Sequence, residues 1–204
     1  MTKVYIKLLS NDVSIDFLIS SLKKDKLDRC SNEKRIRELI QGEKLLINCL
    51  NDLSIPYVLP LDIKLNEHGK PILMNSPISF NISHSKNFIS CAISTSEVGI
   101  DIEEFDENHE KVREKLFSNN EKNKFTATND VIKLWTIKEA YLKMNGTGLI
   151  NELNSLDTKF LRTIQNYDIY SIDGVSVCNM INEKFSISIA TKDNDSDVFI
   201  KFLK

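Results

Sequence analysis

The stretch from residue 134 to residue 149 constrains the fold of this chain more than any other part of the sequence. It reads L-W-T-I-K-E-A-Y-L-K-M-N-G-T-G-L. At about 100° per residue, four apolar side chains fall on one stripe of a helix: Leu134, Ile137, Tyr141 and Met144. This spacing predicts an amphipathic helix whose apolar stripe packs on the core.

The opposite side of the predicted helix carries Trp135, Glu139 and Lys143 at positions i, i+4 and i+8. An ordinary surface helix has assorted charges there, whereas this line holds the only tryptophan of the chain, an acid and a base. Gly146 and Gly148 are expected to end the helix, because glycine adopts the left-handed conformation at little cost. The pattern indicates a helix face with a functional role.

Composition limits the class of protein. A chain of 204 residues has room for one large domain or two small ones, and 41% hydrophobic with 27% charged residues is typical of a globular protein. The net charge of −2 disfavours non-specific binding to nucleic acid or to a membrane surface. The sequence starts without the apolar run of a signal peptide, and no stretch approaches the roughly 20 apolar residues of a membrane span. We therefore expect a cytoplasmic protein.

The number and spacing of the cysteines also agree with a cytoplasmic protein. Four of them lie far apart and form no C-x-x-C pair: Cys30, Cys49, Cys91 and Cys178. This spacing favours reduced thiols and no structural zinc site.

Hydrophobic periodicity predicts helices and strands in the first half of the chain. Helices are expected over residues 12–22 and 32–50, and Ser31 is the expected N-cap of the second. Gly69 and Pro71 favour a turn over residues 67–71. Strands are expected over residues 3–8, near residue 63, and over residues 79–83, 89–94 and 98–103.

The second half repeats this mixture of elements. Helical charge patterning covers residues 107–116, and Ser118 with Glu121 fits a capping box that starts another helix. Residues 193–197 are expected to form an exposed turn. Strands are expected over residues 158–163, 167–172, 175–179, 185–190 and 198–202. Helices combined with antiparallel strands in each half indicate an α+β fold.

The strand predicted over residues 98–103 reads V-G-I-D-I-E. Because side chains alternate along a strand, Asp101 and Glu103 share one face while Ile100 and Ile102 enter the core. With Glu139 from the helix, these acids offer three hard oxygen ligands of the kind that magnesium prefers. The alternative is a solvated strand face and an unrelated helical glutamate.

A third polar group follows the strand predicted over residues 79–83, in the sequence F-N-I-S-H-S. Ser83, His84 and Ser85 are expected to form a turn that can donate hydrogen bonds to a phosphate. A serine hydrolase is disfavoured, since the sequence has no G-x-S-x-G elbow. A structural histidine is the other alternative. The sequence has neither a P-loop nor a G-x-G-x-x-G fingerprint, which disfavours the common nucleotide-binding folds.

The motifs G-K-P, F-N-I-S-H-S, G-I-D-I-E and W-T-I-K-E-A-Y-L-K-x-x-G-x-G-L follow one another in this order. Residues 69–149 thereby resemble the surfactin-type 4′-phosphopantetheinyl transferases. The resemblance implies an α+β fold of two similar subdomains, related by a pseudo-twofold axis, with the active-site cleft between them. We expect residues 1–97 to hold the nucleotide end of coenzyme A and residues 98–204 to hold magnesium and the catalytic helix.

The resemblance also implies an activity. Members of this family transfer the 4′-phosphopantetheine arm of coenzyme A to a serine hydroxyl of an apo acyl or peptidyl carrier protein. The reaction depends on magnesium and releases adenosine 3′,5′-bisphosphate. Such proteins serve fatty-acid, polyketide or nonribosomal peptide biosynthesis, and the surfactin type commonly acts as a monomer. The sequence does not distinguish among these carriers.

The family's functional residues carry over by motif. Asp101, Glu103 and Glu139 match the magnesium ligands, and Lys138 and Lys143 match lysines beside the pyrophosphate. The residues that match coenzyme A contacts are Ser83 and His84 at the 3′-phosphate, Gly69, Lys70 and Pro71 at the adenine nucleotide, and Arg37, with Lys23, Lys24 or Lys26 as alternatives, among the N-terminal basic residues.

The chemistry of phosphoryl transfer agrees with these residues. Charge develops on the phosphate oxygens and on the departing phosphate, so positioning and cations supply most of the catalysis. We expect Asp101, Glu139 and Lys143 to be catalytic, with Lys143 neutralising the leaving side. Glu139, or a metal-bound water that it orients, is the expected base for the serine proton.

Two other functions fit parts of the pattern. A magnesium-dependent nuclease or phosphohydrolase also uses a D-x-E strand and a helical acid, but it has no use for Ser83 and His84. A non-catalytic module that binds coenzyme A or a carrier protein would retain three unneutralised carboxylates in one cleft, which is destabilising without a metal.

Overall fold

The computed structural model describes residues 1–105, 113–114, 117–146, 156, 158, 167–192 and 198–203. Several predicted features lie wholly or mostly outside the described residues. They are the helix over residues 107–116, the strand over residues 158–163, the turn over residues 193–197, and Gly148.

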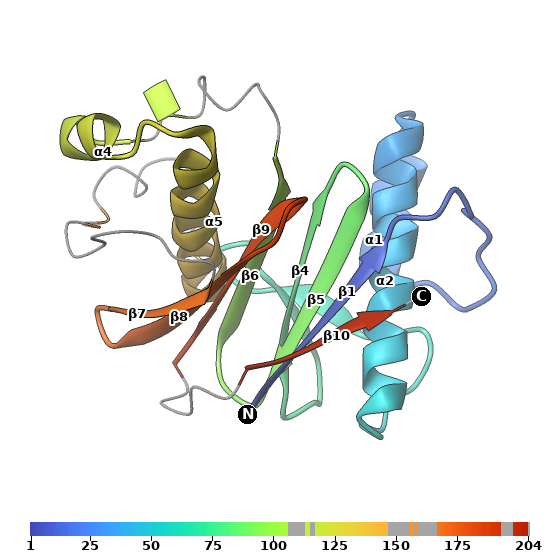
Figure 1. Cartoon of the computed structure of the whole chain (residues 1–204). Coiled ribbons are helices and arrows are strands. Elements are labelled where there is room, and N and C mark those ends of the chain that lie inside the picture. Colours follow the sequence, from blue (N-terminus) through green and yellow to red (C-terminus); the bar gives the residue numbers. More distant parts are fainter. Residues whose placement is uncertain are drawn as a thin grey trace.

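Two four-stranded sheets form the centre of the molecule (Figure 1). The strands of the first sheet, in spatial order, are β10 (Val198–Leu203), β1 (Thr2–Leu8), β5 (Phe88–Ser94) and β4 (Ser79–Ser85). Those of the second are β6 (Val98–Glu104), β9 (Phe185–Thr191), β8 (Val175–Ile181) and β7 (Tyr167–Ile172). All neighbouring pairs are antiparallel except β1 with β10. β2 (Ile63–Leu65) and β3 (Pro71–Leu73) pair with each other in a separate two-stranded sheet.

A long helix covers one face of each sheet, and Figure 1 shows the two sheets between these helices. Helix α2 (Glu33–Asp52) buries Leu46 and Leu50 against the first sheet, and α5 (Thr128–Asn145) buries Leu134 and Ile137 against the second. The other faces of both sheets share a third apolar cluster, to which Ile6 of β1 and Ile187 of β9 both belong. Two shorter helices are α1 (Ser21–Asp28) and α4 (Asn119–Lys124). None of the helices in the described part of the chain has the length and hydrophobicity that a membrane span requires.

The two sheets meet where β4 runs beside β6. Asn81 Oδ1 accepts a hydrogen bond from Ile100 N (2.9 Å), and Ser83 Oγ accepts one from Ile102 N (3.3 Å). Ser85 Oγ accepts one from Glu104 N (3.0 Å). Alternate side chains of β4 therefore accept hydrogen bonds from the N–H groups at the edge of β6. In a continuous sheet, the carbonyl groups of a paired strand would accept these bonds.

Helix α5 packs unusually close to β6. A Cβ atom at Gly99 would lie 2.1 Å from Ala140 O and 2.3 Å from Met144 N. Only glycine leaves room for this approach, which brings the acidic strand and the helix into contact. The helix ends as predicted at Gly146, whose φ of 73° lies in the left-handed region.

The α+β fold predicted from the sequence is confirmed, and most predicted strands agree with the structure to within two residues. The capping box is also confirmed, since Ser118 and Glu121 bond to each other's backbone N–H at the start of α4. All four cysteines are free. The pseudo-twofold axis stays a prediction, as does the division at residue 97. The chain changes sheets between β5 and β6, but β10 returns to the first sheet.

Two predictions about helices in the first half were wrong. Residues 12–20 are not helical, because Asp12 Oδ1 accepts from Ser14 N (2.8 Å) and Asp12 O accepts from the Gln41 amide. These side-chain bonds compete with a helix. The N-cap of α2 is Asn32, which accepts from Arg35 N, in place of Ser31.

The predicted turn at Ser83, His84 and Ser85 was also wrong. Strand β4 continues through Ser85, and the chain turns at Lys86, whose φ is 31°. The physical reason is the bonding to β6, since the hydroxyl groups of Ser83 and Ser85 keep this part of β4 extended beside its neighbour.

The close approach at Gly99 leads to a testable prediction. We expect Gly99→Ala to lower the free energy of unfolding by about 3 kcal/mol or more, because the added methyl group overlaps backbone atoms that cannot move independently. Gly42→Ala in α2 is the matched control. Its Cβ would meet its nearest neighbour at 3.6 Å, and alanine favours a helix by up to about 1 kcal/mol. Urea denaturation of both variants checks this prediction, and equal stabilities would contradict it.

Candidate active site

Strand β6 presents Asp101 and Glu103 on the face that α5 covers. Alternation along the strand places Ile100 and Ile102 in the apolar cluster on the other face, as predicted. The Asp101 side chain is only 3% exposed. The alternative of a solvated strand face therefore does not hold.

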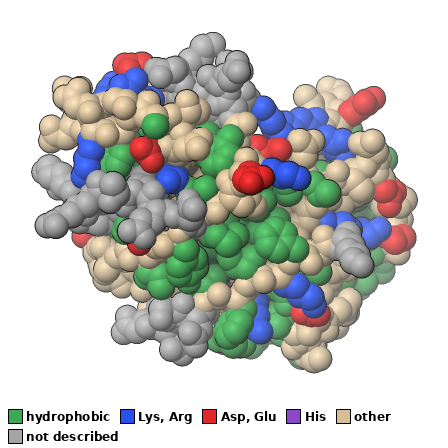
Figure 2. All heavy atoms as spheres, in the orientation of Figure 1, with side chains coloured by type: hydrophobic (Ala, Val, Ile, Leu, Met, Phe, Trp, Pro, Cys, Tyr) green, Lys and Arg blue, Asp and Glu red, His purple; other side chains and the backbone are tan. Residues whose placement is uncertain are grey.

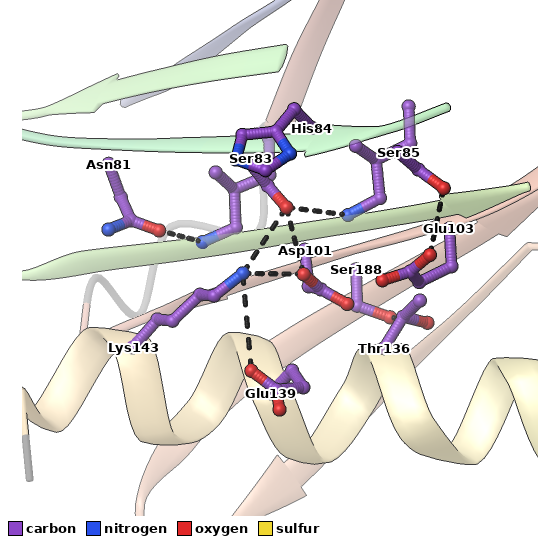
Figure 3. Close-up of polar contacts among 12 residues, drawn as sticks. Asn81, Ser83, His84, Ser85, Asp101, Glu103, Thr136, Glu139, Lys143 and Ser188 are labelled. Atoms are coloured by element: carbon purple, nitrogen blue, oxygen red, sulfur yellow. Dashed lines mark hydrogen bonds and ion pairs between the residues drawn. The ribbon is translucent and has the colours of Figure 1, made fainter. Parts of the chain in front are cut away.

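Helix α5 supplies Glu139 and Lys143 opposite these acids (Figure 3). Lys143 Nζ donates to Asp101 Oδ1 at 2.5 Å and lies 4.0 Å from Glu139 Oε2. The functional face predicted for this helix is thus a buried face against β6. The structure brings all three predicted catalytic residues together.

Strand β4 supplies two serines that bond to the acids of β6. Ser83 Oγ donates to Asp101 Oδ1 (2.8 Å) and accepts from Lys143 Nζ (3.2 Å). Ser85 Oγ donates to Glu103 Oε2 (2.8 Å). The serines that join the two sheets also orient the two acids.

Burial and mutual repulsion perturb the pKa values of the carboxyl groups. Burial, followed by the charge of Asp101, raises the pKa of Glu139 to about 8. The same two causes raise the pKa of Glu103 to about 7, although hydrogen bonds from Ser85 and Trp135 act in the other direction. For Lys143, burial alone would lower the pKa, but Asp101 and Glu139 outweigh it and the pKa is raised.

The site has an excess of negative charge and unused oxygen atoms. Asp101 Oδ2 and Glu139 Oε1 are buried without a hydrogen-bond partner. Within the described residues, no group of three or more histidine, cysteine, aspartate or glutamate side chains is arranged to hold a metal ion. The unpartnered hard oxygens nevertheless suit a divalent cation that would join Lys143 in balancing the three carboxylates.

A polar cluster that the sequence did not suggest lies beside the acids. Thr136, one turn before Glu139, has its hydroxyl 3.0 Å from Ser186 Oγ and 2.9 Å from Ser188 Oγ. Asn179 donates to both serine hydroxyls. Ser188 faces Asp101 across the β6–β9 ladder. These small polar residues come from three elements, so no local motif could have revealed the cluster.

His84 belongs to a second group, formed with the start of α2. Arg35 Nη1 donates to His84 Nε2 at 2.8 Å and to Glu38 Oε2 at 3.2 Å. Burial lowers the pKa of His84, while the charge of Glu38 raises it and that of Arg35 lowers it. Arg35 is not among the residues predicted from the sequence, and the guanidinium of the predicted Arg37 donates to Asn11 (2.8 Å).

The turn at Gly69 lies at the other end of the site. Lys70 Nζ donates to Glu97 Oε2 (2.5 Å) and to Met144 O (2.9 Å), so it caps the end of α5. A pocket of about 190 Å³ lies between this turn and α5. Its lining residues are His68, Gly69, Lys70, Pro71, Asn81, Leu142, Lys143 and Gly146.

Lys138 does not lie where the motif placed it. Its side chain is 0% exposed, and its Nζ donates to Glu121 Oε2 at 2.8 Å, away from the three acids. Glu121 also accepts a hydrogen bond from Thr158. Neighbours on a helix point about 100° apart, so Lys138 and Glu139 cannot share one face. Lys138 thus connects α5 to α4 and Thr158.

Known proteins provide an independent comparison. The family model described as the 4′-phosphopantetheinyl transferase superfamily matches residues 97–193. The 4′-phosphopantetheinyl transferase gsp of Aneurinibacillus migulanus is 38% identical over 150 residues, which cover 69% of this chain and 62% of that protein. The corresponding Sfp protein of Bacillus subtilis strain 168 is 30% identical over 151 residues, covering 69% and 66%.

A third relative gives a similar result over a shorter region. The 4′-phosphopantetheinyl transferase HetI of Nostoc sp. is 35% identical over 94 residues, or 40% of each chain. For gsp and Sfp, the chain spans somewhat less than two thirds of the length of each protein. The matched region includes β6 and α5, and the resemblance predicted from the motifs is confirmed. The chain belongs to the 4′-phosphopantetheinyl transferase superfamily.

Proposed function

We propose that this protein transfers the 4′-phosphopantetheine arm of coenzyme A to a serine hydroxyl of an apo acyl or peptidyl carrier protein. The main support is the convergence of Asp101, Glu103 and Glu139 on Lys143 at the junction of the two sheets. Such a group can hold a diphosphate ester through cations. The superfamily membership supports the same reaction.

Magnesium is part of this proposal, and the residues fit it. Asp101, Glu103 and Glu139 would hold the ion, and the unpartnered Asp101 Oδ2 and Glu139 Oε1 are available to it. When bound, magnesium would neutralise charge on the pyrophosphate and on the departing phosphate.

The chain's own residues account for the remaining steps. The serine oxygen of the carrier attacks the pantetheine-side phosphorus, and the bond from that phosphorus to the bridging oxygen breaks. Glu139 is the proposed acceptor of the serine proton, because its carboxylate belongs to the same buried group as Asp101 and Lys143. Lys143 stabilises the charge that develops on adenosine 3′,5′-bisphosphate as it leaves.

The nucleotide end of coenzyme A is proposed to lie between the two polar groups described above. Arg35 supplies the cation and His84 a hydrogen-bonding group for the 3′-phosphate, with Ser83 beside them. The pocket next to Gly69 is the proposed site of the adenine nucleotide. We infer Arg35 as the basic residue of α2 in this role, in place of Arg37. Monomeric action stays a prediction.

Transfer itself is the first test. The purified protein, coenzyme A, magnesium and an apo carrier protein should give a carrier whose mass has increased by one phosphopantetheine group. We expect Asp101→Asn to reduce the rate by a factor of about 10³ or more, because it removes both a metal ligand and the partner of Lys143. The exposed Asp62 provides the control Asp62→Asn.

The same assay separates the alternatives. Near-normal turnover by a folded Asp101→Asn variant would contradict the assigned site. Cleavage of nucleotides or nucleic acid without a gain in carrier mass would indicate a hydrolase. Binding of coenzyme A without either product would indicate a non-catalytic module.

Magnesium binding can be tested without any substrate. Trp135 is the only tryptophan of the chain and hydrogen-bonds to Glu103, so its fluorescence should report the state of this acid. We expect a saturable fluorescence change when magnesium is added at pH 8, and loss of the change in Glu103→Gln. Glu104→Gln is the matched control, because Glu104 bonds to Asn87 at the end of the same strand. An unchanged response in Glu103→Gln would remove Glu103 from the proposed ligands.

The raised pKa of Glu139 predicts how stability depends on pH. Between about 4.5 and about 8, the folded metal-free protein retains a proton on Glu139 that the unfolded chain has released. The free energy of unfolding should therefore fall as pH rises through this range. In Glu139→Gln this contribution is absent, so the variant should be more stable than the original protein at pH 8 but not at pH 4.5.

Urea denaturation in the presence of a chelator measures this difference. Glu183→Gln, at an exposed position in the β8–β9 turn, controls for the loss of a carboxylate as such. If the stability curves of Glu139→Gln and the original protein run parallel from pH 4.5 to pH 8, the raised pKa is disproved.

A further inference from the structure

Lys70 is a buried cation in the turn between β2 and β3. Figure 2 shows lysine and arginine side chains on the surface of one face of the molecule, which is the usual position for these residues. The side chain of Lys70, in contrast, is only 5% exposed. Its Nζ donates to Glu97 Oε2 (2.5 Å) and to Met144 O (2.9 Å). The charge of Lys70 is therefore used inside the protein.

The two partners of Lys70 belong to the elements that carry the acids and Lys143. Glu97 immediately precedes β6, the strand of Asp101. Met144 follows Lys143 in the last turn of α5. We call the contacts of Lys70 with Glu97 and with Met144 O the Lys70 bridge. This bridge joins the start of β6 to the end of α5, so it helps to fix how these two elements lie relative to each other.

The backbone of Met144 is held on two sides. Its nitrogen packs so closely on β6 that a Cβ atom at Gly99 would lie 2.3 Å from it. Its carbonyl oxygen accepts from Lys70 Nζ. The last turn of a helix has carbonyl groups without partners inside the helix, and a cation beside them is favourable. Lys70 therefore stabilises the last turn of α5 in contact with the strand.

Hydrogen bonds also fix the turn that carries Lys70. Asn66 Oδ1 accepts from His68 N (3.0 Å) and from Lys70 N (2.8 Å). Asn66 N donates to Lys70 O (2.9 Å), and Gly69 in the same turn has a φ of 84°, in the left-handed region. The backbone of Lys70 is thus held in place, and its side chain connects this turn to α5.

We propose that Lys70 is a positioning residue, which holds Lys143 in place through the carbonyl group of Met144. This inference rests on the proposed function and differs from the nucleotide contact that the motif predicted for Lys70. Lys143 directly precedes Met144, and its Nζ reaches Asp101 Oδ1 at 2.5 Å (Figure 3). Loss of the bridge therefore weakens the placement of Lys143 beside the pyrophosphate. The turn of Lys70 still lines the proposed pocket of the adenine nucleotide.

Steady-state kinetics with coenzyme A test this proposal. We expect Lys70→Met, which removes the charge of the side chain but retains most of its length, to lower kcat roughly tenfold, the effect of losing one hydrogen bond to a charged group. KM for coenzyme A should change little, because the variant loses no contact with the nucleotide. A raised KM with an unchanged kcat is the result for a residue that binds the nucleotide directly, and it would overturn the proposal.

A double-mutant cycle identifies the residue through which Lys70 acts. Lys70→Met should add little to Lys143→Met, because the placement that Lys70 supports no longer matters once Lys143 is replaced. Additive losses of kcat would contradict the proposal. Lys64→Met, at an exposed position of β2 in the same hairpin, is the matched control and should leave both kcat and KM unchanged.

Hydrogen exchange provides a measurement that needs no substrate. The Gly146 N–H donates to Leu142 O (2.8 Å) in the last turn of α5. In Lys70→Met this N–H should exchange roughly ten times faster, while the N–H groups of the first two turns of α5 keep their protection. Unchanged exchange at Gly146 would overturn the proposal.

A second variant covers the case in which Lys70→Met does not fold. Glu97 is the half-exposed partner in the bridge, and Glu97→Gln removes only its charge. This variant should lower kcat and speed the exchange of the Gly146 N–H in the same direction but less strongly, and no change in either quantity would overturn the proposal. If the exchange results are as expected but the original protein modifies no carrier, the proposed function is wrong and the Lys70 bridge is not.

Discussion

The contact between β4 and β6 is the constraint on which the active site depends. Asn81, Ser83 and Ser85 accept hydrogen bonds from alternate N–H groups of β6, so two separate sheets are joined through side chains. The same serine hydroxyls donate to Asp101 and Glu103. A small hydroxyl group can do both because it has one proton to donate and two lone pairs to accept. Ser83 and Ser85 therefore join the two sheets and orient the two acids at the same time.

The site is electrostatically costly in the free protein. Three carboxylates lie at the contact between α5 and β6, with Lys143 as the cation that contacts Asp101 and approaches Glu139. Burial and mutual repulsion raise the pKa values of Glu103 and Glu139, and two carboxylate oxygens have no hydrogen-bond partner. A cation bound at these oxygens would relieve the excess of negative charge.

Local patterns were the most predictable part of this protein. The helix through Glu139 and the strand through Asp101 follow from short-range periodicity, and Gly146 ends the helix where its backbone freedom predicted. Contacts between distant segments were not predictable in this way. The hydrogen bond between Arg35 and His84 was not predicted, because the two residues are 49 positions apart in the sequence. Lys138 was misplaced because a motif gives the order of residues but not the direction of each side chain around the helix.

The sequence by itself determined the chemical types that the site needs and the elements that carry them, because these depend on residue identity and on periods of two or about 3.6 residues. Only the tertiary structure decided that the acidic face of β6 is buried, that Ser83 and Ser85 belong to a strand, and that Arg35 bonds to His84. Each of these outcomes depends on hydrogen bonds across many residues of chain. Such bonds form only after packing has brought the segments together, and they then override local preference.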